Sequence, residues 1–125
     1  MGGFVKFRAP VHSDERGRLL VVEHSILHYS PRRVFVVTGA QPGIHRGDHL
    51  VPCLQTMVLV SGGVDVTLRD SRDADARHER LDVPGDALNL LQGEFVTYVL
   101  DGPESTIMVL AEASYLRPNE SEVLS

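Results

Sequence analysis

The sequence contains few residues that could form covalent cross-links or a membrane anchor. Its single cysteine, Cys53, cannot form an internal disulfide, and the absence of a cysteine pair argues against a thiolate zinc site. No run of eighteen apolar residues is present, so no membrane span is predicted. Residues 1–8 lack the long apolar run of a signal peptide, so we expect a cytoplasmic protein.

Basic residues are also scarce relative to acidic ones. Twelve Lys and Arg residues oppose seventeen Asp and Glu residues, which gives a formal net charge of −5. An acidic surface repels phosphodiester polymers, so a nucleic-acid polymer is not an expected partner. Lys6 is the only lysine, and all other basic residues are arginines. The planar guanidinium matches carboxylate and phosphate oxygens, so a local site for an anionic small molecule is compatible with the acidic balance.

Length and periodicity predict a single all-β domain over residues 1–125. The chain has 125 residues, of which 42% are hydrophobic and 23% charged, as in ordinary globular proteins. Apolar runs of strand length alternate with turn clusters, and no helical apolar stripe extends over three turns. Predicted strands cover residues 4–7, 19–22, 34–37, 57–60, 64–68, 87–91, 95–100 and 107–111. This pattern is typical of an antiparallel sandwich or barrel.

Three local features complete this prediction. Gly62 and Gly63 lie between two apolar runs and predict a hairpin turn, because glycine tolerates the positive φ angles of such turns. The polar residues 71–77 predict a solvated loop between strands. A short helical turn is predicted near residues 117–123.

The densest group of chemically active side chains lies just before an apolar strand. Its members are His45, Arg46, Asp48, His49, Cys53 and Gln55. Imidazole, with an ordinary pKa of ~6.5, suits proton transfer near neutral pH, so His49 is a candidate general base. The alternative interpretation, which the spacing alone favours, is a structural histidine held by hydrogen bonds inside a barrel. The two-residue period would place His49, Val51, Cys53 and Gln55 on one strand face, although Pro52 interrupts the ladder.

Metal binding and cysteine nucleophilicity are not indicated by the pattern. The position two residues after His49 is Val51, and the remaining histidines are scattered along the chain. A metal site needs at least three converging ligands, so no metal is predicted. Cys53 is expected to be a core residue, because a thiol needs an adjacent base to act as a nucleophile. Asp14 and Arg16 are typical of a turn closed by an ion pair, whereas Arg33 could face an anion.

Several of these residues together resemble the small cupin-fold sugar-nucleotide ketoisomerases. This family comprises the dTDP-4-keto-6-deoxyhexose 3,4-ketoisomerases and their WxcM-like relatives, and the resemblance spans residues 10–117. The matching positions are Asp14, Arg16, Gly17, Leu19, Glu23, Arg32, Arg33, Val34, Phe35, Arg46, Gly47, Asp48, His49, Gln55, Gly62, Val109, Leu110, Ala111, Tyr115 and Arg117.

The resemblance implies an all-β cupin-type antiparallel jelly-roll barrel, which in this family is usually a homodimer. It also implies a dTDP-sugar substrate held by its diphosphate, with no metal or other cofactor. The implied isomerase moves a carbonyl from C4 to C3 of the sugar, with His49 as general base and Arg46 as its catalytic companion. The motif positions Arg33, Gln55 and Arg16 are expected to bind the substrate. Asn89 and Tyr98, which no family motif matches, are two further candidate substrate-binding residues.

The sequence departs from the family pattern at the expected catalytic positions. The second motif histidine is Val51, the strand tyrosines are Phe35 and Val36, and a later Trp-His pair is Phe95-Val96. Residues that could substitute are Tyr98, Asn89, Glu94, Asp48 and Cys53. Two alternatives therefore stay open. The first is a cupin isomerase, cyclase or dehydratase acting on a less polar biosynthetic intermediate, and the second is a non-catalytic binding module.

Overall fold

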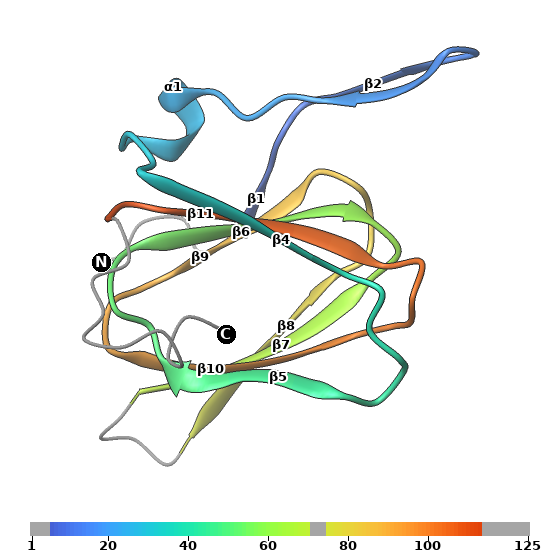
Figure 1. The fold of residues 1–125 in the computed structure, drawn as a ribbon. Coiled ribbons are helices and arrows are strands. Elements are labelled where there is room, and N and C mark those ends of the chain that lie inside the picture. Colours follow the sequence, from blue (N-terminus) through green and yellow to red (C-terminus); the bar gives the residue numbers. More distant parts are fainter. Residues whose placement is uncertain (1–5, 71–74, 114–125) are drawn as a thin grey trace.

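Two antiparallel β-sheets face each other in the computed structural model, which describes residues 6–70 and 75–113 (Figure 1). The five-stranded sheet has the order β1 (Lys6–Arg8), β9 (Asp86–Leu90), β6 (Gln55–Ser61), β11 (Thr106–Ala111), β4 (Arg33–Thr38). The four-stranded sheet has the order β5 (His45–Leu50), β10 (Glu94–Leu100), β7 (Val64–Asp70), β8 (Ala76–Leu81). The predicted antiparallel, nearly all-β class is confirmed.

The main hydrophobic core fills the space between the two sheets. Alternate residues of each strand point into it, as in β6, where Met57 and Leu59 are fully buried between the sheets. The other face of β6 is buried as well, because Val58 packs beneath Leu27 and Tyr29 on the outside of the five-stranded sheet. Burial of both faces explains why β6 reads as a continuous apolar run instead of an alternating one.

Two small elements lie outside the five-stranded sheet. Helix α1 (His24–Leu27) buries Leu27 and ends at His28, which has a left-handed φ of 64°. A two-stranded hairpin, β2 (Val11–Asp14) and β3 (Gly17–Leu20), stands away from the sheets (Figure 1). No helix within residues 6–70 and 75–113 has the length and hydrophobicity needed to cross a membrane.

The predicted hairpin at Gly62-Gly63 is wrong. Strands β6 and β7, which flank these glycines, belong to different sheets, so the segment is a corner between the sheets. Gly62 has a φ of +73°, and a Cβ there would lie 2.6 Å from the Cα of Ser105. The Gly63 amide donates to Ser105 Oγ at 3.0 Å. Glycine is needed at this corner because the chain passes close to the β10–β11 connection.

Two further predictions need revision at their boundaries. The predicted loop over 71–77 overlaps β8, which already begins at Ala76, whereas residues 71–74 lie outside the described residues. Strands β5 and β8 escaped prediction because polar side chains occupy their inward positions, which removes the apolar alternation. The predicted helical turn at 117–123 lies outside the described residues.

Candidate active site

One end of the space between the sheets collects polar side chains. Residues 51–54 connect β5 to β6 at this end, and residues 91–93 connect β9 to β10. Both connections cross from one sheet to the other. We call this end the mouth. Inward-facing residues near these connections therefore lie around its rim.

On the five-stranded sheet, the strand register aligns four residues in a row at the mouth. Ala111 pairs with Arg33 on one side and with Gln55 on the other, and Gln55 pairs with Leu90. Directly opposed residues project from the same face of a sheet, and Leu90 belongs to the core between the sheets. Arg33 and Gln55 therefore face inward, and Gln55 is buried at 5% relative exposure.

A second row lies at the mouth end of the four-stranded sheet. Val96 pairs with His49 on one side and Leu68 on the other, and Leu68 pairs with Arg77. Val96 and Leu68 are core residues with 2% and 1% relative exposure. His49 and Arg77 consequently project inward at opposite edges of this row.

A bulge in β5 places both Arg46 and His49 on the inward face. Residues three apart on a regular strand would point to opposite faces. Here the β5–β10 register shifts between Val96 and Thr97, and Gly47 and Asp48 both have positive φ, 87° and 56°. Arg46 therefore pairs with the inward-facing Tyr98, next to the pair of His49 and Val96.

The bulge also turns Asp48 away from the interior. Its carboxylate accepts a hydrogen bond from Thr97 Oγ1 at 2.8 Å, and both residues lie on the outer face of the four-stranded sheet. Asp48, a residue that the sequence offered as a possible substitute inside the site, therefore does not face the mouth.

The imidazole of His49 is half-buried and is oriented by the backbone carbonyl of the next residue, Leu50. Nδ1 lies 3.0 Å from the carbonyl oxygen of Leu50. A carbonyl can only accept, so in the neutral ring this contact favours the tautomer with the proton on Nδ1. The unshared electron pair then resides on Nε2, which is the atom able to accept a proton from a ligand.

The second layer of the interior combines polar and apolar side chains. Tyr98 pairs with Arg46 and Val66, and Val66 pairs with Glu79. Tyr98 is buried at 4% relative exposure, and its hydroxyl has no hydrogen-bond partner among the described residues. Polar groups buried in this way are rare and call for an explanation.

An ion-pair group that the sequence did not reveal lies on β8. Arg77 Nη1 donates to Glu94 Oε2 at 3.2 Å, and its Nε lies 3.4 Å from Glu79 Oε2. Glu94 also accepts from the amide of Leu91 at 2.8 Å, so it holds the 91–93 connection in place. Arg77 and Glu79 share a strand face with the buried Leu81, but hydrophobic periodicity gives no signal for an inward face made of charged residues.

Beyond these two layers the interior is apolar. Its side chains come from both sheets and are buried to 7% relative exposure or less: Val37, Leu59, Val64, Leu81, Leu100 and Ile107. Among the described residues, the inward-facing polar side chains of the strands thus lie in the mouth half, and the strands of the opposite half contribute apolar side chains.

Two predicted binding residues lie away from this site. Asn89 is on the opposite face of the five-stranded sheet, where its Oδ1 accepts from Thr56 Oγ1 at 2.8 Å. Thr56 is also 2.7 Å from the hydroxyl of Tyr29, which packs in the outer cluster with Ala87. Asn89 points away from the mouth because the inward face of β9 carries Leu88 and Leu90.

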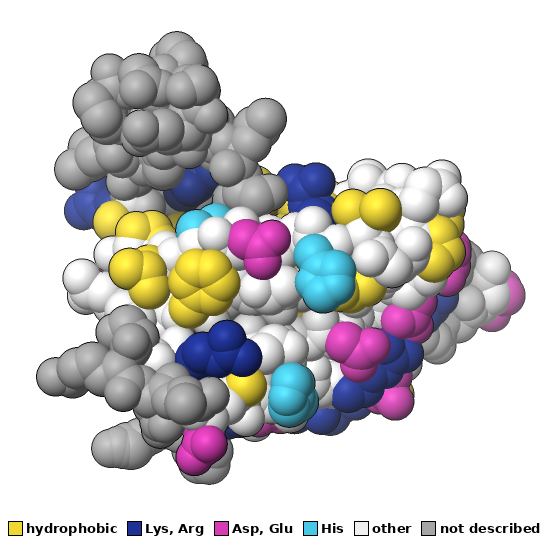
Figure 2. All heavy atoms as spheres, turned by 90° about the horizontal axis from the view of Figure 1, so that it is seen from below, with side chains coloured by type: hydrophobic (Ala, Val, Ile, Leu, Met, Phe, Trp, Pro, Cys, Tyr) yellow, Lys and Arg dark blue, Asp and Glu magenta, His cyan; other side chains and the backbone are white. Residues whose placement is uncertain are grey.

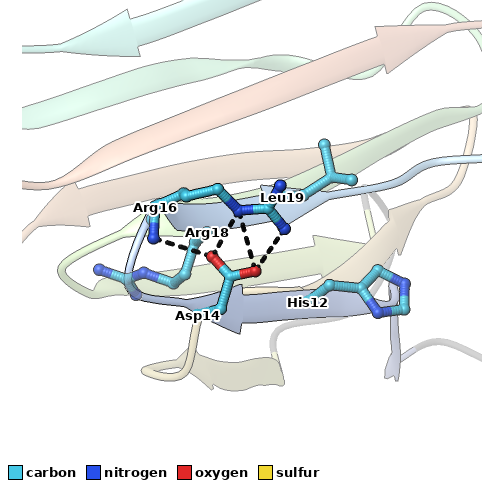
Figure 3. Close-up of a pocket in the computed structure, with 6 residues that line it drawn as sticks. His12, Asp14, Arg16, Arg18 and Leu19 are labelled. Carbon is cyan, nitrogen blue, oxygen red and sulfur yellow. Dashed lines mark hydrogen bonds and ion pairs between the residues drawn. The ribbon is translucent and has the colours of Figure 1, made fainter.

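Arg16 is the other predicted binding residue outside the mouth. It lies at the tip of the β2–β3 hairpin. The backbone amide of Arg16 donates to the Asp14 carboxylate at 2.8 Å, and the Arg16 guanidinium donates to the same carboxylate (Figure 3). These bonds lower the pKa of Asp14 and raise that of Arg16. The two residues, with His12, Arg18 and Leu19, line an open hollow of 270 Å³ (Figure 3). Within one chain this hollow is separate from His49.

The outer face of the four-stranded sheet carries a second open hollow of 270 Å³. Histidine, acidic, basic and hydrophobic side chains are interspersed on this face (Figure 2). The hollow is lined by His45, Asp48, Thr67, Arg69, Phe95 and Thr97. Within the described part of the chain, no three His, Cys, Asp or Glu residues are grouped so that they could hold a metal ion.

Comparisons with known proteins agree with this architecture. The profile of the family described as FdtA: WxcM-like, C-terminal matches residues 4–120. The fold is similar to QdtA, a sugar 3,4-ketoisomerase from Thermoanaerobacterium thermosaccharolyticum solved with TDP, with a TM-score of 0.79, 20% identity and coverage of 89% of this chain and 81% of that one. No curated protein sequence matches the chain.

Two further solved structures extend the comparison. The WlaRB TDP-quinovose 3,4-ketoisomerase from Campylobacter jejuni has a TM-score of 0.77 and 22% identity, covering 90% of this chain and 87% of that one. ChmJ, a 3'-monoepimerase from Streptomyces bikiniensis in complex with dTDP-quinovose, has a TM-score of 0.74 and 19% identity, covering 89% and 64%. These likenesses confirm the predicted cupin-type jelly-roll fold.

Proposed function

Because the chain belongs to the WxcM-like FdtA family, we propose that it is a sugar-nucleotide isomerase of the 3,4-ketoisomerase type. Its substrate would be a dTDP-4-keto-6-deoxyhexose, and His49 would be its general base. The observation that carries this proposal is the β5 bulge, which turns His49 and Arg46 together into the mouth. QdtA and WlaRB, which share the fold, are 3,4-ketoisomerases of sugars and of TDP-quinovose.

The reaction needs a base for a carbon-bound proton and a stabiliser for the resulting oxygen charge. Nε2 of His49 removes the proton from C3 of the substrate, which converts the C4 carbonyl into an enediolate. The guanidinium of Arg46, on the same inward face, offsets the negative charge on the enediolate oxygen. Return of a proton to C4, together with transfer of the O3 proton to O4, completes the movement of the carbonyl to C3.

The remaining inward-facing polar groups are suited to hold the substrate. Arg33 lies at the mouth with its guanidinium 4.7 Å from the centre of the Phe35 ring, an arrangement that orients the guanidinium. An oriented arginine at an open rim suits the diphosphate of a nucleotide sugar. Gln55, buried between Arg33 and the β9 strand in the same row, supplies an amide for sugar hydroxyls.

A second candidate function rests on the apolar part of the mouth. Val51 is 1% exposed and Val96 is 2% exposed, and Phe35 packs against the same core. These apolar side chains beside the inward-facing polar groups favour ligands with fewer hydroxyl groups than a hexose. An isomerase, cyclase or dehydratase reaction on a less polar intermediate would use the same His49 base.

We also propose that the protein is a homodimer. An isolated two-stranded hairpin has little stability in water, yet β2–β3 stands away from the sheets (Figure 1). Leu19 on this hairpin is 62% exposed, and Val34 and Val36 on the outer face of β4 are 54% and 57% exposed. A second copy of the chain could cover these apolar side chains.

The proposed reaction is tested by hydrogen exchange with solvent. The protein is incubated with dTDP-4-keto-6-deoxyglucose in D₂O, and deuterium at C3 and the appearance of the 3-keto sugar are followed by NMR. We expect both with the unaltered protein. We expect His49→Ala to lose about 10²–10⁴-fold in rate. The control His45→Ala removes an imidazole from the outer face of the same strand and should retain the rate.

The possible outcomes separate the three functions. If the unaltered protein binds dTDP, saturation at a hundred times the dissociation constant should stabilise it by ~2.7 kcal/mol. Stabilisation without C3 exchange contradicts the ketoisomerase and leaves a binding module. If dTDP does not stabilise the protein and no exchange occurs, the hypothesis of a less polar substrate is favoured. Exchange that persists in His49→Ala removes His49 from the role of base.

A further inference from the structure

The two buried tyrosines of the described structure differ in how their hydroxyl groups are satisfied. The Tyr29 hydroxyl lies 2.7 Å from Thr56 Oγ1 and donates to the Leu110 carbonyl at 3.1 Å. The Tyr98 hydroxyl is equally buried, but it has no hydrogen-bond partner within residues 6–70 and 75–113. Tyr29 serves packing outside the five-stranded sheet, whereas Tyr98 points into the interior that contains His49.

The β5 bulge makes room for the Tyr98 ring on the side of β5. A Cβ on Gly47 would lie 3.3 Å from both Cδ1 and Cε1 of Tyr98 and 2.9 Å from the carbonyl oxygen of Val96. The ring therefore lies against the glycine that precedes His49 by two residues. Diagonal neighbours across an antiparallel pair are within reach of aromatic side chains, and Tyr98 is the diagonal neighbour of His49 on the inward face.

From this placement we propose that Tyr98 is a second catalytic residue, which moves a proton between the two substrate oxygens while His49 serves the carbons. The inference rests on the proposed ketoisomerase function. An unpartnered phenolic hydroxyl can both donate and accept, as this role demands. Tyr98 would supply the second proton-transferring group, because this sequence has Val51 in place of the second motif histidine and Phe35 in place of a strand tyrosine.

The proton transfers balance over one turnover. His49 Nε2 takes the proton from C3 as Tyr98 donates its hydroxyl proton to O4, which yields a neutral enediol. Tyr98 then takes the proton from O3 as His49 delivers its proton to C4. The C3–O3 bond becomes the carbonyl, O4 becomes a hydroxyl, and both side chains return to their starting protonation states. No external acid, base or oxidant is required.

The experiment compares Tyr98→Phe with the matched control Tyr29→Phe. Tyr98→Phe keeps the ring and removes a buried hydroxyl that has no partner, so we expect the Tm to stay unchanged or rise. We expect its rate of ketoisomerisation to fall about 10²–10⁴-fold, while the dTDP-induced Tm shift is retained. Tyr29→Phe loses hydrogen bonds, so its Tm should fall by about 3–6 °C with the rate retained.

The outcomes separate this inference from the proposed function. An unaltered protein without C3 exchange or turnover overturns both. An active unaltered protein with an equally active Tyr98→Phe variant overturns the role of Tyr98 alone. A Tyr98→Phe variant that loses both Tm and activity, as a structural tyrosine would, overturns it as well. Only loss of turnover with stability and dTDP binding preserved supports it.

Discussion

At the scale of single residues, Gly47 and Asp48 determine what faces the interior. Both have positive φ, and the resulting bulge allows Arg46 and His49, three residues apart, to share one face. Without the bulge, one of these two side chains would project to the outer surface. The chemistry of the mouth therefore depends on a glycine that itself carries no reactive group.

Replacement of Gly47 by alanine tests this dependence. At a φ of +87° an L-residue is strained, and the new methyl group would meet the Val96 carbonyl oxygen at 2.9 Å and the Tyr98 ring at 3.3 Å. The control Gly43→Ala has a similar φ of +83° but open space around the new Cβ. We expect Gly43→Ala to cost about 1–2 kcal/mol of unfolding free energy and Gly47→Ala about 1–3 kcal/mol more.

Urea unfolding measures these costs, and C3 exchange measures the effect on the site. The displaced Tyr98 ring should lower the exchange rate in Gly47→Ala, whereas Gly43→Ala should exchange like the unaltered protein. Equal stability of the two variants would show that the bulge can relax without moving Tyr98.

Sequence patterns identified the residue types of the site better than their directions. His49, Arg46, Gln55 and the rim residue Arg33 all face the mouth, but the sequence contains no clear sign of the bulge that aligns the first two. Asn89 points to the other face, because direction on a strand depends on which face the neighbouring leucines occupy.

The ion-pair group on β8 was missed for a related reason. Arg77 and Glu79 are polar residues at inward positions, and hydrophobic periodicity cannot detect an inward face that is itself charged. Only their register with Leu68 and Val66 of β7 reveals that they face the interior.

At the scale of elements, local turn signals located the strands but not their partners. The Gly62-Gly63 turn is real, yet it joins strands of different sheets, because a turn sequence encodes a change of direction and not the hydrogen-bonding neighbour. Pairing instead follows from long-range burial, such as that of β6 between β9 and β11. The antiparallel all-β class could be predicted from alternation, whereas the sheet order could not.

An ion pair ties the edge strand β8 to the end of β10. Arg80 donates to both carboxylate oxygens of Asp101 at 2.7 Å, and these hydrogen bonds lower the pKa of Asp101. A carboxylate with a lowered pKa stabilises the fold above its unfolded pKa of ~3.9, and this contribution disappears as the pH falls through the folded value. We expect Asp101→Asn to cost about 0.5–1 kcal/mol at pH 7, since both partners are partly exposed.

The pH dependence distinguishes this pair from a general charge effect. The stability difference between Asp101→Asn and the unaltered protein should shrink as the pH falls below ~3.9 and should also decrease in high salt. Asp82→Asn removes an exposed carboxylate from the loop after β8 and serves as the control. A deficit that is the same at pH 7 and at pH 2.5 would contradict the assignment to the ionised pair.

At the scale of the whole molecule, polarity divides the interior into two halves. The apolar half, which includes Leu59, Leu100 and Ile107, supplies a close-packed core. The mouth half carries the inward-facing arginines, His49, Gln55 and Tyr98. The same two sheets thus place a close-packed apolar core at one end and the candidate site at the other.

The last prediction concerns the proposed homodimer and is based on the outer surface of the five-stranded sheet. Exposed apolar side chains on β4 and on the hairpin form a surface that a second copy would remove from water. We expect the unaltered protein to sediment as a dimer and Val36→Glu to sediment as a monomer, because a buried unpaired carboxylate is costly. Ile44→Glu, which alters a side chain of similar exposure before β5, should stay dimeric. If the unaltered protein sediments as a monomer, or both variants dissociate equally, the interface does not lie on β4.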